Sequence, residues 1–326
     1  MARKDEFELL GVKECIGKCA SFALTEKGKE LVLTTPPFSE KVLPFELSRL
    51  KEASDIILVN GKFPLRNASD LLKSYTRASK GGTLEERELY SIAEEIEVSK
   101  EVKTYFAPLE EEAANLHEEA MRLEIREDLM EKIFSCIGND LSVMDSASHK
   151  LLGIRKSITS TKKEIVSCLP SILSKYASFL TSMQFALKNG HYTLPVSSSF
   201  KNVVRGLIQD ISSSENTYFI EPEELLQKNA KLEELYAEER VEVARILAEL
   251  SSHVHDEVDV LMENATILSD LDYLQAKVLY GETYSGHVGD LSTEGTLFLP
   301  AAFHPLLEVA TIVKNDFSLN SKKRVV

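Results

Sequence analysis

The chain has 326 residues, of which 43% are hydrophobic and 28% are charged, and its formal net charge is −14. These proportions are those of an ordinary globular protein and exclude a disordered or fibrous chain. The length is sufficient for two or three domains, and no run of about 18 to 20 apolar residues predicts a transmembrane helix.

The N-terminus and the cysteines indicate a cytoplasmic protein. Residues 1–6 are mostly charged and lead into an amphipathic segment, so they lack the apolar region of a signal peptide. Four cysteines are spread widely over the chain and do not form the pattern of a disulfide scaffold. We therefore expect a protein of the reducing cytoplasm that has no membrane partner.

Residues 1–140 are predicted to form a helical core domain. Apolar side chains recur at helical spacing over residues 5–33. A second helix is expected over 43–59, where an Asn-Gly pair follows as a stop signal, and a short capped helix is expected over 70–78. This part of the chain therefore reads as a bundle of helices joined by short turns.

Two further helices are expected to complete this core domain. Thr83 and Glu86 have the spacing of a capping box, which predicts a helix over residues 84–105. Pro108 suits the first turn of a helix, because its fixed φ and missing donor are tolerated there, and the pattern continues over 108–135.

The pattern changes after residue 140. Residues 141–183 are predicted to form a long outgoing helix, capped by one of residues 145–146 and carrying an interruption at Pro170. Residues 184–222 are rich in β-branched and aromatic residues and form a predicted β-rich tip. Its Asn189-Gly190 pair is typical of a type I′ hairpin turn.

Residues 223–285 are predicted to form the returning helix, since apolar residues step by three or four over 247–268, as in a coiled-coil seam. Residues 286–326 contain a loop and a short strand over 297–299, and the chain ends without a stop signal, as though cut. The expected fold is mainly α: a helical core domain plus a long antiparallel two-helix lever with a small β-rich clamp-like tip.

Charge is distributed unevenly along the chain. Residues 146–209 contain nine Lys or Arg residues and one acid, Glu164, a net charge of +8, whereas the rest of the chain carries −22. Such asymmetry predicts an anionic partner. The alternative is a solvated basic helix face that pairs with the acidic helix following it.

Cations and aromatic residues in the tip are the main candidates for nucleic-acid contact, because phosphates require cations and hydrogen-bond donors. No acid occurs between Gln184 and Gln209. The tip candidates are Lys188, His191, Tyr192, Lys201 and Arg205, and the outgoing helix adds Arg155, Lys156, Lys162 and Lys163. The alternative is an ordinary basic surface patch.

No catalytic or metal site is predicted. A P-loop-like segment over residues 11–19 has the wrong glycine spacing and lies within a helical pattern. His253 and His255 are two residues apart and point away from each other on a helix. Cys15 and Cys19 share a helix face but have no third ligand nearby. We therefore expect these residues alone not to form an enzyme.

Five collinear motifs resemble the type-two branch of the bacterial MutS family. Two long motifs lie in the tip, and the FIEP segment that ends the second of them is specific. The motifs are RASKGG over 77–82, DSAS over 145–148 with LGIR over 152–155, KNGHYTLPV over 188–196, GLIQDISSSENTYFIEP over 206–222, and HPLL over 304–307 with ND at 315–316.

This resemblance implies a helical core, a two-helix lever and a clamp, followed in the family by a dimerising ABC-type ATPase domain and often by a Smr nuclease-like domain. Residues 286–326 would then be the truncated N-terminal edge of the ATPase domain, with Val313, Asn315 and Asp316 beside the adenine of a nucleotide. No cofactor is expected for these residues alone, whereas ATP and Mg²⁺ are expected for the full-length protein, which would be a homodimer.

The chain departs from the family pattern at four places. His191 stands where Arg is usual, Gln209 where His is usual, and Glu215-Asn216 replaces Ser-Gly. Phe303 stands where Arg commonly precedes His-Pro. Because the change at residue 191 removes a fixed charge, we expect a weaker and partly pH-dependent grip on phosphate.

Three alternative functions are therefore considered for the chain. The first is the core and lever-clamp region of a MutS-like DNA-binding ATPase that binds branched or duplex DNA and restrains recombination. The second, within the same family, is the arm of a factor that acts on stalled or collided ribosomes. The third is a structural coiled-coil spacer whose charges pair only with each other.

Overall fold

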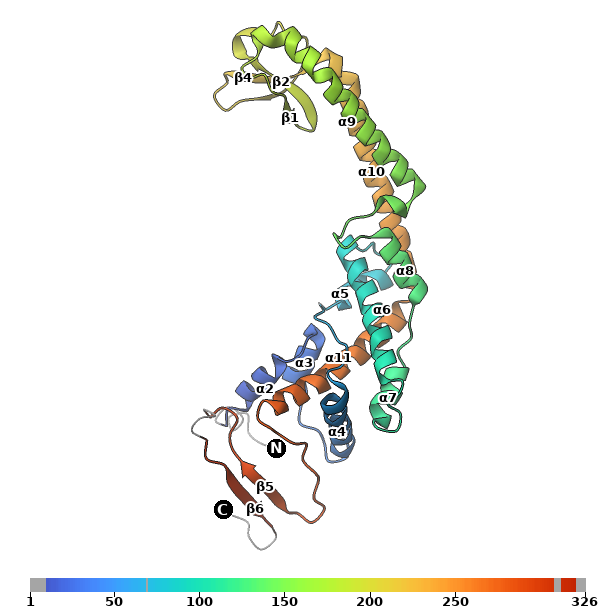
Figure 1. Cartoon of the computed structure of the whole chain (residues 1–326), viewed down its shortest axis with the longest axis vertical. Helices are drawn as coiled ribbons and strands as arrows, with labels where there is room; N and C mark the ends of the chain where they lie inside the picture. Colours follow the sequence, from blue (N-terminus) through green and yellow to red (C-terminus); the bar gives the residue numbers. More distant parts are fainter. Residues whose placement is uncertain (1–9, 69, 308–311, 321–326) are drawn as a thin grey trace. The chain divides into compact units, whose positions relative to one another are not determined.

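The computed structural model describes residues 10–68, 70–307 and 312–320 (Figure 1). The chain divides into two compact units. Residues 1–131 and 252–326 form the core unit, and residues 132–251 form the hairpin unit. Most described residues are helical and the sheets are small and antiparallel, which confirms the mainly α expectation.

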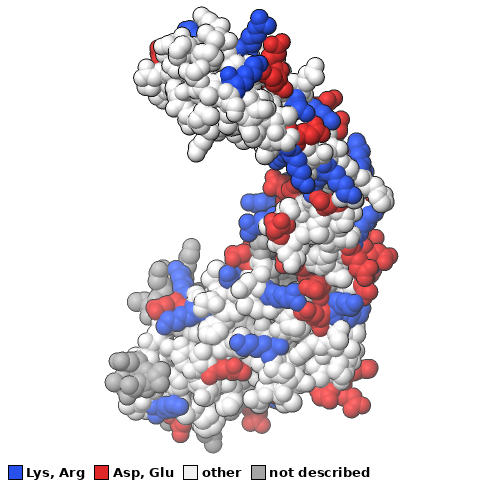
Figure 2. Space-filling model, turned by 45° about the horizontal axis from the view of Figure 1, so that its top comes forward, with Lys and Arg blue, Asp and Glu red and all other residues white. Residues whose placement is uncertain are grey.

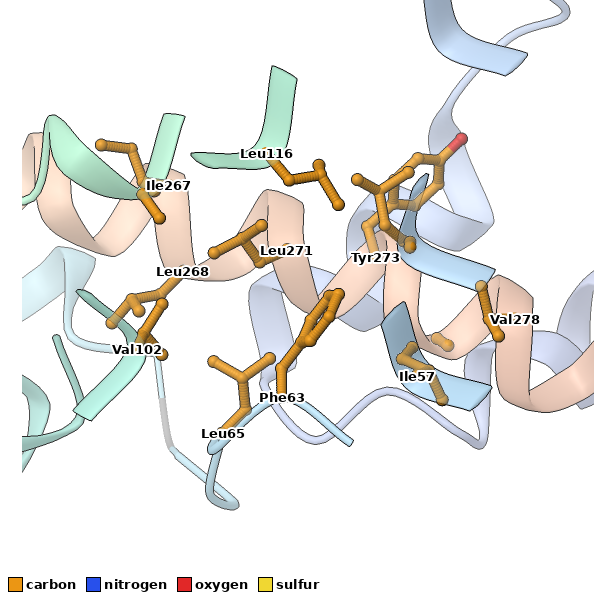
Figure 3. Packing of buried hydrophobic residues seen from close by; sticks show 14 of the residues in the cluster. Ile57, Phe63, Leu65, Val102, Leu116, Ile267, Leu268, Leu271, Tyr273 and Val278 are labelled. Atoms are coloured by element: carbon orange, nitrogen blue, oxygen red, sulfur yellow. The ribbon is translucent and has the colours of Figure 1, made fainter. Parts of the chain in front are cut away.

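The core unit is a helical assembly around one central helix, α11. Its apolar side chains, among them Ile267, Leu268 and Leu271, are buried with residues of the N-terminal helices and of α6 and α7 (Figure 3). The elements are α2 (Val12–Ala20), α3 (Glu26–Thr34), α4 (Leu43–Asn60), α5 (Leu72–Ser79), α6 (Glu86–Phe106), α7 (Ala114–Met121), α8 (Glu127–Cys136, reaching into the hairpin unit), α11 (Val258–Glu282), β5 (Leu297–Ala302) and β6 (Asn315–Leu319).

The helix predicted over residues 5–33 is wrong as one element; within the described part it is two helices. Thr25 caps α3, because its hydroxyl accepts a hydrogen bond from Gly28 N at 2.9 Å. The fully buried Asp272 of α11 accepts from the Leu24 and Thr25 backbone N–H groups and from the Thr25 hydroxyl. A carboxylate 247 residues away therefore sets the break between α2 and α3.

Helix boundaries elsewhere in the core unit also differ from expectation. The capping box at the start of α6 joins Glu85 and Glu88, so the predicted box of Thr83 and Glu86 is wrong. The helix predicted over 108–135 is two helices, α7 and α8, and Pro108 precedes both. Lys103 of α6 donates to the carbonyls of Met121 and Leu123, which terminates α7 with a cation at its negative end. By contrast, α4 ends as predicted, with Gly61 at φ 84°.

The hairpin unit consists of two antiparallel helices and a four-stranded sheet (Figure 1). Ion pairs join the two helices at successive levels along their length: Arg155 pairs with Glu239, and Glu164 pairs with Lys228. Apolar residues seven positions apart on the first helix fill the interface between the helices. The elements are η1 (Asp145–Ala147), α9 (His149–Tyr176), η2 (Ala177–Phe179), β1 (Ala186–Lys188), β2 (His191–Ser197), η3 (Ser198–Phe200), β3 (Gly206–Ile211), β4 (Thr217–Pro222) and α10 (Glu223–Asp256, reaching into the core unit).

Both long helices differ in length from the prediction. Ser148, rather than residue 145 or 146, caps α9 by accepting from Leu151 N at 2.9 Å, and the helix continues through Pro170 to Tyr176. The returning helix predicted over 223–285 is broken at Glu257, which separates α10 from α11.

The predicted β region is confirmed. The strands pair in the order β1-β2-β4-β3, all antiparallel, and Asn189 and Gly190 adopt φ values of 51° and 84° in the turn between β1 and β2, as a type I′ turn requires. Leu194, Val196 and Ile220 project from the sheet into the core formed with α9 and α10. The strand predicted over 297–299 is also present, as β5.

Candidate nucleic-acid interface

The predicted cations of α9 fall into paired and unpaired groups. Arg155 is paired: its guanidinium donates to Glu239 and Asp145, each at 2.6 Å, and to the Val143 carbonyl at 2.8 Å. Lys156 and Lys163 are exposed and make no ion pair with a described residue. They are seven positions apart, so they lie on the same face of the helix.

Lys162 lies against an aromatic ring of the neighbouring helix. Its ammonium is 5.3 Å from the centre of the Tyr236 ring in α10, which is within cation–π range. The hydrogen bond with the Tyr236 hydroxyl raises the pKa of Lys162, so the lysine remains charged at neutral pH. Its charge is thus held at the surface of the hairpin without neutralisation by an acid.

Lys188 finds an acidic partner immediately beyond the acid-free segment. Its ammonium lies 2.8 Å from Asp210 Oδ2 and 4.3 Å from the centre of the Phe219 ring. The hydrogen bond from Lys188 lowers the pKa of Asp210, so this carboxyl group is ionised at neutral pH. The contact joins β1 to β3, the two outer strands of the sheet, and partly neutralises one predicted phosphate ligand.

Lys201 and Arg205 are the exposed cations between β2 and β3. The Lys201 ammonium lies 4.8 Å from the centre of the Tyr218 ring. The Arg205 side chain makes no ion pair with a described residue, while its carbonyl accepts from Glu223 N at 3.1 Å and so fixes the backbone there. These two residues therefore present unneutralised charge beside the sheet.

His191 lies inside a polar cluster that we name the Glu221 cluster: His191, Gln209, Glu221 and Asn229. Glu221 is only 1% exposed. Its Oε2 atom is 2.8 Å from His191 Nδ1 and 2.6 Å from Gln209 Nε2, and its Oε1 atom accepts from Asn229 Nδ2 at 2.8 Å. The exposed Glu233 carboxylate lies 3.7 Å from the other ring nitrogen of His191, Nε2. A phosphate contact by His191 would therefore compete with both carboxylates.

Two departures from the family pattern meet in the Glu221 cluster. His191 and Gln209 replace the usual Arg and His, and both contact the same oxygen atom of Glu221. Tyr192 is half-buried against the same core, and its backbone pairs with Asn229. Glu221 and Asn229 were absent from the sequence-based candidates, although the FIEP motif contained the signal for Glu221.

The predicted nucleotide-pocket residues lie in or beside β6. Val313 is exposed, and its carbonyl accepts from Asn315 Nδ2 at 3.3 Å. Asp316 accepts from Ala301 N at 2.7 Å and so holds β6 to β5. Thr311, beside them, lies outside the described residues. A nucleotide contact by Val313, Asn315 and Asp316 stays a prediction.

Among the described residues, no group of three or more His, Cys, Asp or Glu side chains is arranged to hold a metal ion. No helix in the described ranges is both long and apolar enough to cross a membrane.

A pocket of about 380 Å³ in the core unit contains a perturbed carboxyl group, that of Glu95. Burial raises the pKa of Glu95 from 4.5 to about 7, against the hydrogen bond that the Tyr75 hydroxyl donates to it at 2.5 Å. The folded state therefore binds this proton more tightly than the unfolded state. The stability that depends on it is complete below pH 4.5 and is lost as the pH rises through about 7.

We expect Glu95→Gln, which keeps an acceptor for Tyr75, to remove this pH dependence. Between pH 4.5 and 7.5 the unsubstituted chain should lose roughly 3 kcal/mol of unfolding free energy relative to the variant. Urea denaturation followed by circular dichroism across this range measures the difference. A difference that stays constant with pH would contradict the assignment.

The collinear motifs, together with a helical core unit and a helix–sheet–helix unit, define a MutS-like protein. No protein-family model matches the chain. It is 34% identical over 301 residues, 91% of its length, to a protein named Endonuclease MutS2 from Clostridium perfringens. Proteins of the same name from Staphylococcus carnosus and a Geobacillus species are each 31% identical to it, over 322 and 313 residues.

The chain therefore belongs to the MutS2 family, the type-two branch that the motifs indicated. It spans about two fifths of the length of the curated relatives it matches: 38% of the C. perfringens protein and 41% of the S. carnosus protein.

Proposed function

We propose that this chain is the nucleic-acid-engaging core and lever-clamp region of a MutS-like DNA-binding ATPase, which binds branched DNA and restrains recombination. In this proposal α9 and α10 are the lever, and the four-stranded sheet is the clamp. ATP and Mg²⁺ binding and homodimerisation belong to the whole protein, and these residues alone are not an enzyme. The name of the relatives, endonuclease, supports a nucleic-acid target.

One observation carries the proposal: the hairpin unit exposes cations that make no ion pair with a described acid, and four of them are predicted phosphate ligands. Lys156 and Lys163 share a face of α9, and Lys201 and Arg205 lie beside the sheet. If every cation paired with an acid of the same unit, as Arg155 does with Glu239, the spacer function would be favoured. Free cations are instead available to replace the counterions of a phosphate backbone.

The test measures binding of the 326-residue chain to four-way-junction DNA over a series of salt concentrations. We expect log K to fall linearly with log salt, and each of Lys156→Gln, Lys163→Gln and Arg205→Gln to reduce the slope by about 0.9. Lys51→Gln, at an exposed lysine of α4 in the core unit, is the matched control and should leave the slope unchanged. Slopes that do not respond to the hairpin variants would refute the DNA contact.

A competition assay with the unsubstituted chain distinguishes DNA from the ribosome as the target. On the DNA proposal, an excess of junction DNA releases the chain from purified ribosomes in a sedimentation assay, and junction binding persists without them. Stable co-sedimentation that junction DNA does not reduce, together with absent junction binding, would instead establish the ribosome as the target.

A further inference from the structure

The strand β3 forms an exposed apolar ridge at the edge of the sheet. It is the last strand in the order β1-β2-β4-β3 and pairs only with β4. Leu207 and Ile208 are 57% and 53% exposed. Exposed aliphatic side chains on an open strand edge are costly in water and are usually covered or replaced by charges. We therefore expect a binding partner to cover this edge of the sheet.

The register makes the ridge narrow and two-sided. Leu207 lies opposite Glu221 and Ile208 opposite Ile220, so the two side chains project on opposite faces of the sheet. The far half of β3 is tied to the turn after β1, because Asn189 Nδ2 donates to the Gln209 carbonyl at 2.8 Å. Only the first half of the strand is thus left open.

The ridge is held rigidly at its base. At Gly206 the strand passes so close to β4 that a Cβ atom would lie 2.0 Å from the Glu221 carbonyl oxygen. The bond from Glu223 N to the Arg205 carbonyl anchors the residue before it. A projection fixed by backbone contacts on both sides can insert into a partner without first losing conformational freedom.

Charge complementarity identifies the partner. Arg205 is exposed, has no described acidic partner, and directly precedes the ridge, and Lys201 lies nearby in the same loop. In Figure 2 the lobe that contains the sheet shows a broad, mostly uncharged face, and charged residues of both signs lie at its margins. The fitting ligand has an apolar surface bordered by negative charge. DNA bases that are not fully stacked, between their phosphates, have this combination.

We propose that Leu207 and Ile208 form an apolar wedge that inserts at unstacked bases of branched DNA, while Arg205 binds the adjacent phosphate. The inference rests on the proposed function and specifies how this site distinguishes branched from linear DNA. Inserting an aliphatic wedge between stacked base pairs costs stacking energy. That cost is already met at a junction, where stacking is interrupted, so the wedge favours branched over linear substrates.

The experiment compares Leu207→Ser/Ile208→Ser with Arg205→Gln on a four-way junction and on a linear duplex of the same sequence. We expect the double variant to lose at least about tenfold in affinity for the junction and less than about twofold for the duplex, with an unchanged salt slope. Arg205→Gln should lower the salt slope by about 0.9 on both substrates. Val241→Ser, at an exposed valine of α10, is the control and should change neither.

A second readout tests insertion itself. A 2-aminopurine at the junction centre should brighten when the unsubstituted chain binds and should not brighten with the double variant. Equal junction affinity and equal brightening of the two proteins would refute the wedge while leaving DNA binding intact. Absence of DNA binding by the unsubstituted chain would refute both proposals. A shift from dimer to monomer in sedimentation velocity, caused by the double variant without DNA, would assign the ridge to a second copy of the chain and overturn the wedge.

Discussion

Replacing Asp272 by alanine is expected to lower the free energy of unfolding by about 3 to 5 kcal/mol, because several partly buried donors lose their acceptor at once. Asp272 has no exposed surface. Its carboxylate accepts from Leu24 N at 3.0 Å, Thr25 N at 2.8 Å and the Thr25 hydroxyl at 2.7 Å. It therefore fixes the start of α3 on α11.

Urea denaturation followed by circular dichroism measures this loss, and two variants control for it. Asp272→Asn keeps one acceptor oxygen and should lose less than Asp272→Ala. Asp55→Ala, at an exposed aspartate of α4, should change the free energy by no more than about 0.5 kcal/mol. A loss below about 1 kcal/mol for Asp272→Ala would show that the turn before α3 holds without the carboxylate.

Replacing Glu221 by leucine is expected to destabilise the hairpin unit by a similar amount, about 3 to 5 kcal/mol. The carboxylate is 1% exposed and joins β2, β3 and α10 through His191, Gln209 and Asn229. Leucine has a comparable volume but leaves the buried Asn229 and the half-buried His191 and Gln209 without this partner. The effect should appear as a lower urea midpoint.

The control for this variant is Glu234→Leu, at an exposed glutamate of α10, which should be nearly neutral. A double-mutant cycle between His191→Ala and Gln209→Ala adds a second check. Because both residues contact Glu221 Oε2, their effects should be non-additive by at least about 0.5 kcal/mol. Strict additivity, or a stable Glu221→Leu variant, would mean that the cluster does not hold the sheet to the helix.

Local signals predicted the sheet well because they act between near neighbours. The Asn189-Gly190 turn needs two left-handed residues in succession, and only a few residue types provide them. The end of α4 at Gly61 has the same local cause. Helix breaks that depend on distant residues could not be predicted in this way. The break before α3 depends on Asp272, and the end of α7 depends on Lys103.

The sequence predicted which cations are in the candidate site, but it did not predict which of them form ion pairs. The excess of cations over residues 146–209 is visible in the sequence, and Lys156, Lys163 and Arg205 are indeed exposed. Lys188 and Arg155, however, meet Asp210 and Glu239, acids that lie outside that segment and reach it only in the folded hairpin. Charge counts within a window cannot detect such partners. The same reason hid the Glu221 cluster, whose members are spread over 39 positions of the chain, from His191 to Asn229.

The central claim is that free cations of the hairpin unit bind the phosphates of branched DNA. Its most direct test is the salt dependence of four-way-junction binding by a variant in which Lys156, Lys163, Lys201 and Arg205 are all replaced by glutamine. We expect the slope of log K against log salt to become shallower by about 3 to 4, with affinity at low salt reduced accordingly. An unchanged slope and affinity, or no junction binding by the unsubstituted chain at low salt, would contradict the claim.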